Sequence, residues 1–143
     1  MNVNLSRARA SLNDLRAGLH QAATLALRAA VEAAEKSAKG TTLWKDRTGG
    51  TRASIKATVL GDRGFVVAGG ASHFLEYGTK AHIIMGRPIL RFVSYGTTYF
   101  RRMVHHPGTK ALYFMEEAKR LGQQTADYGA EYFVSYAIQK ANR

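Results

Sequence analysis

The residues best suited to acid–base or metal chemistry are four histidines and a glutamate, namely His73, Glu76, His82, His105 and His106. His73 and Glu76 are three positions apart, and the two adjacent histidines close an expected strand. Either pair could contribute to a metal site or to general acid–base catalysis. Because neighbouring residues on a strand point to opposite faces, at most one of the adjacent histidines can join a given site.

Patterns that specify a known catalytic chemistry are missing from the sequence. It has no HExxH pair, phosphate-cradling loop, nucleophile elbow or paired carboxylates. Asp46, Asp62 and Asp127 are scattered, and acidic residues, which magnesium-dependent nucleases need, are few. The lack of cysteine excludes a disulfide, a thiolate metal site and a cysteine nucleophile. We therefore expect no catalysis, no cofactor and no metal, with a small metal-dependent nuclease as an alternative.

The charge of the chain is strongly basic, with 21 Lys and Arg against 10 Asp and Glu and a net charge of +11. Most of the excess falls between residues 51 and 110. Such a charge attracts nucleic acid, acidic membranes or acidic proteins, and by itself it does not choose among them. Aromatic and cationic residues interleave in RFVSYGTTYFRR, residues 91 to 102. Such a strand could stack bases, so a basic nucleic-acid-binding module is a second alternative.

The length of 143 residues and a hydrophobic content of 45% fit one globular domain, residues 1–143. We expect an N-terminal helix over 1–40, a sheet with a loop and a hairpin over 41–110, and a C-terminal helix over 111–143. No signal peptide or long apolar run is visible, so we expect a cytosolic protein with no membrane contact.

The N-terminal helix is expected from about Leu5 to Ala38 and ends at Gly40. Small and apolar residues recur along it at steps of three and four: Leu12, Leu15, Leu19, Ala22, Ala26, Ala29 and Ala33. The polar loop that follows, 41–50, contains TGG and is expected to be mobile.

The middle of the chain alternates like strands. Residues 54–60 and 64–70 read as one hairpin with a turn at Gly61 and Asp62, and residues 81–106 read as a second hairpin. A last helix is expected from about Ala111 to Lys140. We therefore predict an α+β fold with an antiparallel sheet of about four to five strands, a protruding hairpin and a C-terminal helix packed on the sheet.

The tetrapeptide GTKA occurs twice, at 78–81 and 108–111. The order TGGTRASI (48–55), HFLEYGTKAHII (73–84) and HHPGTKALYFMEEA (105–118) resembles the head-tail joining proteins, also called neck or tail-completion proteins, of long-tailed double-stranded DNA phages. The two copies would then bracket one hairpin. The chain departs from that family in lacking a proline before TG and in having Thr51 where a leucine is usual.

The resemblance implies a structural ring subunit that joins the tail to the DNA-filled head. It implies ring or partner contacts at Thr48, Gly49, Gly50, Arg87, Arg91, Arg101 and Arg102. It also implies turns of the family motifs at Glu76, Gly78, Thr79, His106, Pro107, Gly108 and Thr109. The glycines would permit turn conformations, the threonines would hydrogen-bond local backbone, and Thr109 could cap the last helix.

The partners that the resemblance implies are other copies in a ring, a hexamer or else a dodecamer, together with connector or stopper proteins and tail-terminator or tail-tube proteins. The location would be the virion neck or tail, and the bacterial host cytoplasm during assembly. Six copies at +11 each would carry 66 positive charges. Channel DNA over a length of about 35–40 Å carries only about 22 negative charges, so non-specific DNA contact would leave most of the charge for protein partners.

Overall fold

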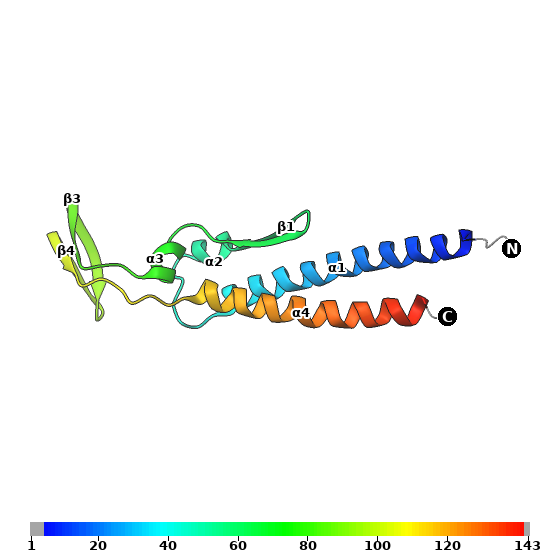
Figure 1. Cartoon of the computed structure of the whole chain (residues 1–143). Coiled ribbons are helices and arrows are strands. Elements are labelled where there is room, and N and C mark those ends of the chain that lie inside the picture. The colour runs from blue at the N-terminus through cyan, green and yellow to red at the C-terminus, as the bar shows by residue number, and fades with distance from the viewer. Residues whose placement is uncertain (1–4, 142–143) are drawn as a thin grey trace. The chain divides into compact units, whose positions relative to one another are not determined.

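The computed structural model describes residues 5–141, which form two compact units (Figure 1). One unit combines the chain up to Gly70 with the segment from Phe114 onward, and the other is Ala71–Tyr113. The α+β class is confirmed. The elements are α1 (Ser6–Gly40), α2 (Gly50–Ser54), β1 (Lys56–Leu60), β2 (Arg63–Val67), α3 (Ser72–Tyr77), β3 (His82–Ser94), β4 (Thr97–His106) and α4 (Phe114–Ala141).

Helices α1 and α4 lie side by side and antiparallel in the first unit (Figure 1). The buried face of α1 is a row of alanines at steps of four: Ala22, Ala26, Ala30, Ala34 and Ala38. The expected stripe ran through Ala29 and Ala33, but Ala29 is exposed and Ala33 is half-buried. The buried row follows the ridge of i, i+4 neighbours, which is inclined to the helix axis, because that ridge is what a crossing helix contacts.

Two glycines of α4 let the helices approach closely along this row. A β-carbon at Gly122 would lie 3.0 Å from the Ala34 β-carbon and 3.1 Å from the Ala30 carbonyl oxygen. A β-carbon at Gly129 would lie 3.1 Å from that of Ala26. Glycine inside a helix costs about 1 kcal/mol relative to alanine. The close backbone contact explains why two such residues stand inside α4.

We expect Gly122→Val to lower the free energy of unfolding by about 1–3 kcal/mol, because the added carbons overpack the helix contact. Gly18 of α1 is the matched control, since a β-carbon there meets nothing within 4 Å. Gly18→Ala should raise the free energy of unfolding by about 0.5–1 kcal/mol through helix propensity alone. Urea unfolding followed by circular dichroism measures both. Equal effects of the two substitutions on the free energy of unfolding would contradict the close helix contact at Gly122.

The hairpin β1–β2 packs on α1 within the same unit. Gly64 of β2 lies directly on the helix, because a β-carbon there would be 2.3 Å from a methyl carbon of Val31. The carboxylate of Glu35 accepts a hydrogen bond from the Ala57 N–H at 2.7 Å, which fixes β1 to the helix. The ion pair with Lys39, and then this hydrogen bond, hold the pKa of Glu35 below its ordinary value.

The second hairpin, β3–β4, forms a separate two-stranded sheet. Its register runs from His82 opposite His106 to Ser94 opposite Thr97, with an irregularity between Met85 and Leu90. The expectation of one sheet of four to five strands is therefore wrong, because the four strands form two separate pairs. Pro88 is compatible with this pairing, because it has no N–H to donate and its strand suits a sheet edge.

Two further boundaries differ from expectation. The segment 71–78, which lies between the two expected hairpins, contains the short helix α3, and the last helix begins at Phe114, three residues later than predicted. In the part of the chain that the structure describes, no helix combines the length and apolar character that crossing a bilayer requires.

Candidate functional site

The two GTKA copies pair with each other. The Thr79 N–H donates to the Thr109 carbonyl oxygen at 3.0 Å, and the Thr109 N–H donates to the Thr79 carbonyl oxygen at 3.0 Å. The two threonine hydroxyl oxygens lie 3.2 Å apart. We call this paired element, residues 78–81 with 108–111, the clasp. It closes the base of the hairpin β3–β4, residues 82–106, which we call the arm.

The glycines of the clasp have nearly the same surroundings. A β-carbon at Gly78 would lie 2.4 Å from the Thr109 carbonyl oxygen, and one at Gly108 would lie 2.2 Å from the Thr79 carbonyl oxygen. Both have positive φ, +71° and +89°. Each glycine therefore packs on the backbone of the other copy, in a conformation that glycine adopts most readily. The repeated letters reflect a local two-fold arrangement.

This pairing corrects two expectations about the threonines. Thr109 does not cap the last helix, because that helix begins five residues later, at Phe114. The threonine hydrogen bonds are not local, because the Thr109 N–H also donates to the Thr79 hydroxyl, 30 positions away, at 3.1 Å. The two glycines have positive φ, a conformation that glycine adopts most readily.

The chain segments that enter and leave the clasp are also joined by backbone hydrogen bonds. The N–H of Leu112 donates to the Leu75 carbonyl oxygen at 3.0 Å, and that of Tyr113 donates to the Glu76 carbonyl oxygen at 3.2 Å. The accepting carbonyls belong to the last turn of α3, where carbonyl oxygens have no hydrogen-bond donor within the helix. The clasp and α3 thus form a continuous base for the arm.

The histidines do not gather as one site. His82 and His106 stand opposite each other at the start of the arm, with ring centroids 5.0 Å apart. His82 Nδ1 donates to the Lys80 carbonyl oxygen at 2.8 Å, whereas His106 Nδ1 accepts the Gly108 N–H at 3.1 Å. His105 lies on the other face of the strand, opposite Ile83. Both paired rings therefore brace the clasp.

The other candidates for acid–base chemistry lie on α3. The His73 ring packs against those of Phe74 and Tyr77, and Glu76 is buried. Between residues 5 and 141, no three His, Asp or Glu side chains are grouped so that they could hold a metal ion.

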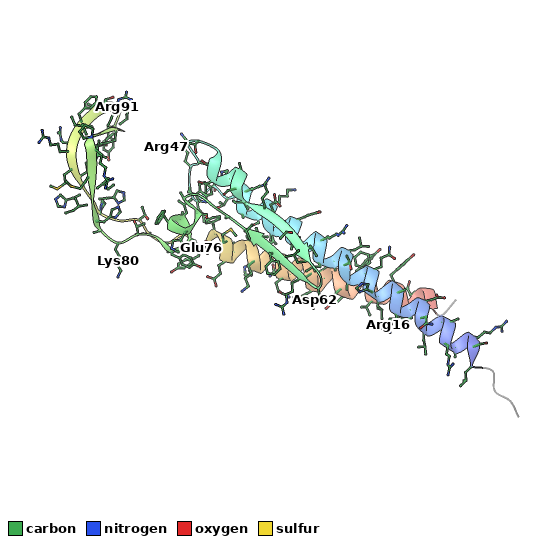
Figure 2. The ribbon with its side chains drawn as sticks, turned by 90° about the horizontal axis from the view of Figure 1, so that it is seen from above. Arg16, Arg47, Asp62, Glu76, Lys80 and Arg91 are labelled. Atoms are coloured by element: carbon green, nitrogen blue, oxygen red, sulfur yellow. The ribbon has the colours of Figure 1, made fainter. Side chains whose placement is uncertain are left out.

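The arm exposes an unusual amount of apolar surface for a two-stranded sheet. Exposed large apolar side chains occur on both of its faces and at its tip: Ile83, Ile84, Met85, Ile89, Phe92, Val93, Tyr95, Phe100 and Met103. Figure 2 shows side chains projecting from the arm around Arg91. Exposed apolar patches of this kind mark interaction surfaces in soluble proteins.

The four arginines of the arm, Arg87, Arg91, Arg101 and Arg102, are all exposed. The register places Leu90 and Arg101 on one face, and Arg91 and Phe100 on the other. The guanidinium of Arg101 lies 5.7 Å from the centre of the Tyr99 ring, which stacks on Phe92. Within residues 5–141 the observed ion pairs lie on α1 and α4, none on the arm. The sequence has no acidic residue from Tyr77 to Met115.

The TGG loop is held by hydrogen bonds of two charged side chains, Asp46 and Arg52. The Asp46 carboxylate accepts hydrogen bonds from the Arg52 N–H at 2.7 Å and the Gly49 N–H at 2.9 Å. These bonds, that from Arg52 most strongly, hold the pKa of Asp46 below its ordinary value, so the contact persists at neutral pH and is lost in acid. Thr48, Gly49 and Gly50 themselves remain exposed.

Arg52 closes this loop onto the end of α1. Its guanidinium donates to the carbonyl oxygens of Lys39, Thr41 and Trp44 and stacks 4.2 Å from the centre of the Trp44 ring. It thereby satisfies carbonyls at a helix end that have no partner inside the helix. The contact residues predicted in the TGG loop and on the arm belong to different units.

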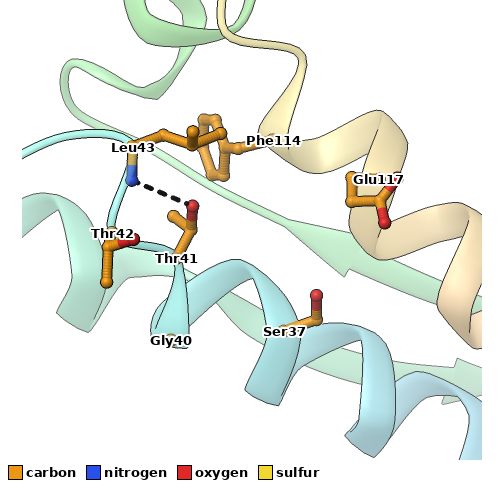
Figure 3. A pocket seen from close by; sticks show the side chains of 7 residues that line it. All are labelled: Ser37, Gly40, Thr41, Thr42, Leu43, Phe114 and Glu117. Atoms are coloured by element: carbon orange, nitrogen blue, oxygen red, sulfur yellow. Dashed lines mark hydrogen bonds between the residues drawn. The ribbon is translucent and has the colours of Figure 1, made fainter.

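A hollow of about 440 Å³ lies between the end of α1 and the start of α4 (Figure 3). Leu43 and Phe114 both line it, and the Leu43 N–H donates to the Thr41 hydroxyl at 3.3 Å. Its one carboxylate, Glu117, is paired with Arg120, which lowers the Glu117 pKa. The other residues of its lining are Ser37, Gly40, Thr41, Thr42, Leu43 and Phe114.

Two residues with clear structural roles were missed at the sequence level. Arg52 was not singled out, although a cation beside a tryptophan-containing loop is a signal for stacking. Tyr95 was seen only as one aromatic among several. The dipeptide Tyr95–Gly96 between two strands could have identified Tyr95 as an unusual turn residue, because a tight hairpin turn normally has Asn-Gly there.

No protein-family model, curated protein or solved structure matches this chain. The function must therefore be argued from the residues of the arm and the clasp.

Proposed function

We propose that this chain is a structural subunit of the ring that joins tail to head in a long-tailed double-stranded DNA phage. In this role it carries out no catalysis and needs no cofactor. The arm and the TGG loop contact neighbouring subunits or neighbouring rings. The order of sequence motifs supplies the class of protein, and the arm supplies the physical support.

The single observation that carries the proposal is the composition of the arm. A two-stranded hairpin is marginally stable in water by itself, and this one has nine exposed large apolar side chains and two unpaired edges. Burying such a surface against other proteins is favourable in proportion to its apolar area. The clasp anchors the hairpin at its base, which suits an element that is presented to a partner.

The partners we propose are other copies of the chain in a ring, a hexamer or else a dodecamer, and the connector, stopper, tail-terminator or tail-tube proteins beside it. A net charge of +11 per copy makes copies repel at long range. Acidic neighbouring proteins would relieve that repulsion more completely than channel DNA can. Contact with DNA is then weak and independent of sequence, with an affinity that falls steeply as salt rises.

Interrupting the gene in the phage that encodes the chain tests this proposal. We expect DNA-filled heads and finished tails to accumulate unjoined, visible by electron microscopy of the lysate. Adding the purified chain should restore joined, infectious particles. Normal yields of joined particles without the chain, or a gene outside any phage assembly region, would refute the proposal.

A further inference from the structure

We infer that the tip of the arm docks into an acidic protein surface, with Tyr95 as the side chain that enters an apolar pocket of that surface. The inference rests on the proposed function for the setting in which the partner is met. It adds the chemistry of the partner and the residue that anchors it.

Tyr95 is held in a conformation that its residue type does not favour. It occupies the first position of a two-residue turn with φ of +49°, and Gly96 follows with φ of +79°. This geometry matches the type I′ turn, in which asparagine or glycine is normal at the first position. Bulky residues with positive φ carry backbone strain, which is retained where a side chain is needed for function.

The Tyr95 side chain is also fully exposed, with a relative accessibility of 104%. The turn therefore places an aromatic ring beyond the end of both strands, where no residue of the arm covers it. Tyrosine offers a large contact area at low conformational cost and is enriched among residues that dominate binding energy. Function at this position thus requires a partner with a pocket for one ring.

The charge of the arm specifies the charge of that partner. Arg91 and Arg101 lie on opposite faces of the arm, in the fourth and fifth residue pairs from the turn, and no carboxylate occurs on the arm. Burying arginines at an interface requires charged or polar groups opposite them. A partner surface with carboxylates on either side of an apolar pocket satisfies both requirements.

Protein is favoured over DNA by the apolar residues that accompany the arginines. Phe92 and Val93 lie on the turn side of Arg91, Phe100 lies opposite it, and all three are exposed. Interfaces between proteins are enriched in aromatic residues, methionine and arginine. DNA-binding surfaces are more polar and gain most of their affinity from phosphate contacts, for which exposed apolar side chains contribute little.

Tyr95→Asn separates function from folding, because asparagine suits the turn better than tyrosine does. We expect this variant to unfold at the same or a higher urea concentration than the native chain, yet to lose about thirtyfold in affinity for the partner, as expected for the loss of a dominant contact. Tyr95→Phe keeps the ring and should lose less than threefold. Equal affinities of the Asn variant and the native chain would overturn the inference.

Photo-crosslinking identifies the partner. The photoreactive amino acid p-benzoylphenylalanine replaces Tyr95 in cells that express the chain from its own locus, and adducts are identified by mass spectrometry. The same replacement at Tyr128, which is 76% exposed on α4, is the matched control. We expect a Tyr95 adduct with one protein segment that contains Asp or Glu, and no such adduct from position 128. An adduct with DNA, an adduct with another copy of the chain, or no adduct would each overturn the inference.

Binding to a DNA probe is a second test of whether the tip contacts protein or DNA. The native chain and Tyr95→Asn should bind a 20-base-pair duplex probe with affinities within about threefold, since that binding is electrostatic. A tenfold loss with the Asn variant would show that the tip contacts nucleic acid, contrary to the inference. If unjoined heads and tails fail to appear in the gene-interruption experiment but the acidic adduct forms, the proposed function is wrong and the tip inference stands.

Discussion

The triple charge reversal R91E/R101E/R102E is expected to reduce the yield of joined, infectious particles about a thousandfold while leaving the purified chain folded. Like charges that face each other across an interface cost several kcal/mol. Even about 1.4 kcal/mol at each of three positions corresponds to tenfold per position and a thousandfold together. Plaque counts after complementation with the variant gene measure the yield.

Folding should survive the triple change because the arm arginines are exposed and take no part in an observed ion pair. Circular dichroism and urea unfolding of the purified variant should match those of the native chain. A loss of folding would instead mean that these side chains contribute to the stability of the hairpin.

A second triple change controls for net charge. R7E/R9E/R16E also lowers the charge from +11 to +5, but on exposed positions of α1. Acidic residues in the first turn of a helix favour its dipole, so α1 should not be weakened by the changes near its start. We expect a yield within tenfold of the native one. Equal losses from both triple variants would mean that overall charge, and not the arm, matters for joining.

Substituting Gly108 by alanine is expected to open the clasp. The new β-carbon would lie 2.2 Å from the Thr79 carbonyl oxygen, which is part of the backbone and cannot move without breaking its hydrogen bond to Thr109. The left-handed conformation adds about 1–2 kcal/mol of strain and the overpacking about 1–3 kcal/mol. The local cost of about 2–5 kcal/mol is comparable with the stability of a small unit.

Hydrogen exchange resolves this effect where global unfolding would not, because the clasp lies in the smaller of the two units. The amide protons of Thr79 and Thr109 should exchange at least thirtyfold faster in Gly108→Ala, which corresponds to about 2 kcal/mol. Gly78→Ala should behave alike, since its β-carbon would approach the Thr109 carbonyl oxygen to 2.4 Å.

Gly96→Ala is the matched control for backbone strain. Gly96 also has positive φ, +79°, but a β-carbon there meets nothing within 4 Å. Its substitution should leave exchange at Thr79 and Thr109 unchanged, since strain at the tip does not reach the clasp. If Gly96→Ala and Gly108→Ala accelerate these amides equally, close packing does not hold the clasp together.

Sequence patterns were sufficient for the two long helices and the two hairpins, but not for the short helices α2 and α3. The long helix ends at Gly40 as expected, and both hairpins occur where alternation and turn residues placed them. Local chemistry determines these features, since periodicity selects helix or strand and glycine permits the turns. The motifs also suggested Gly78 and Gly108 as turn positions, and both have positive φ.

Tertiary structure decided what these elements pack against. The alanine row that α1 buries is displaced by one residue from the expected stripe at Ala30 and Ala34, because the crossing of α4 selects one ridge among several of similar composition. The four strands form two separate hairpins because strand alternation does not specify which strands pair. Arg52 binds carbonyls up to 13 positions away, a partner choice that local spacing does not encode.

The clasp shows the same division most clearly. The sequence determined that GTKA occurs twice and that each copy contains a residue able to turn the chain. Only the fold brought the copies together, because Thr79 and Thr109 are 30 positions apart and their contact depends on the hairpin that the chain forms between them. Almost every residue type has the same backbone N–H and C=O groups, so these groups do not encode a distant partner. The path of the chain in the fold decides which residues pair.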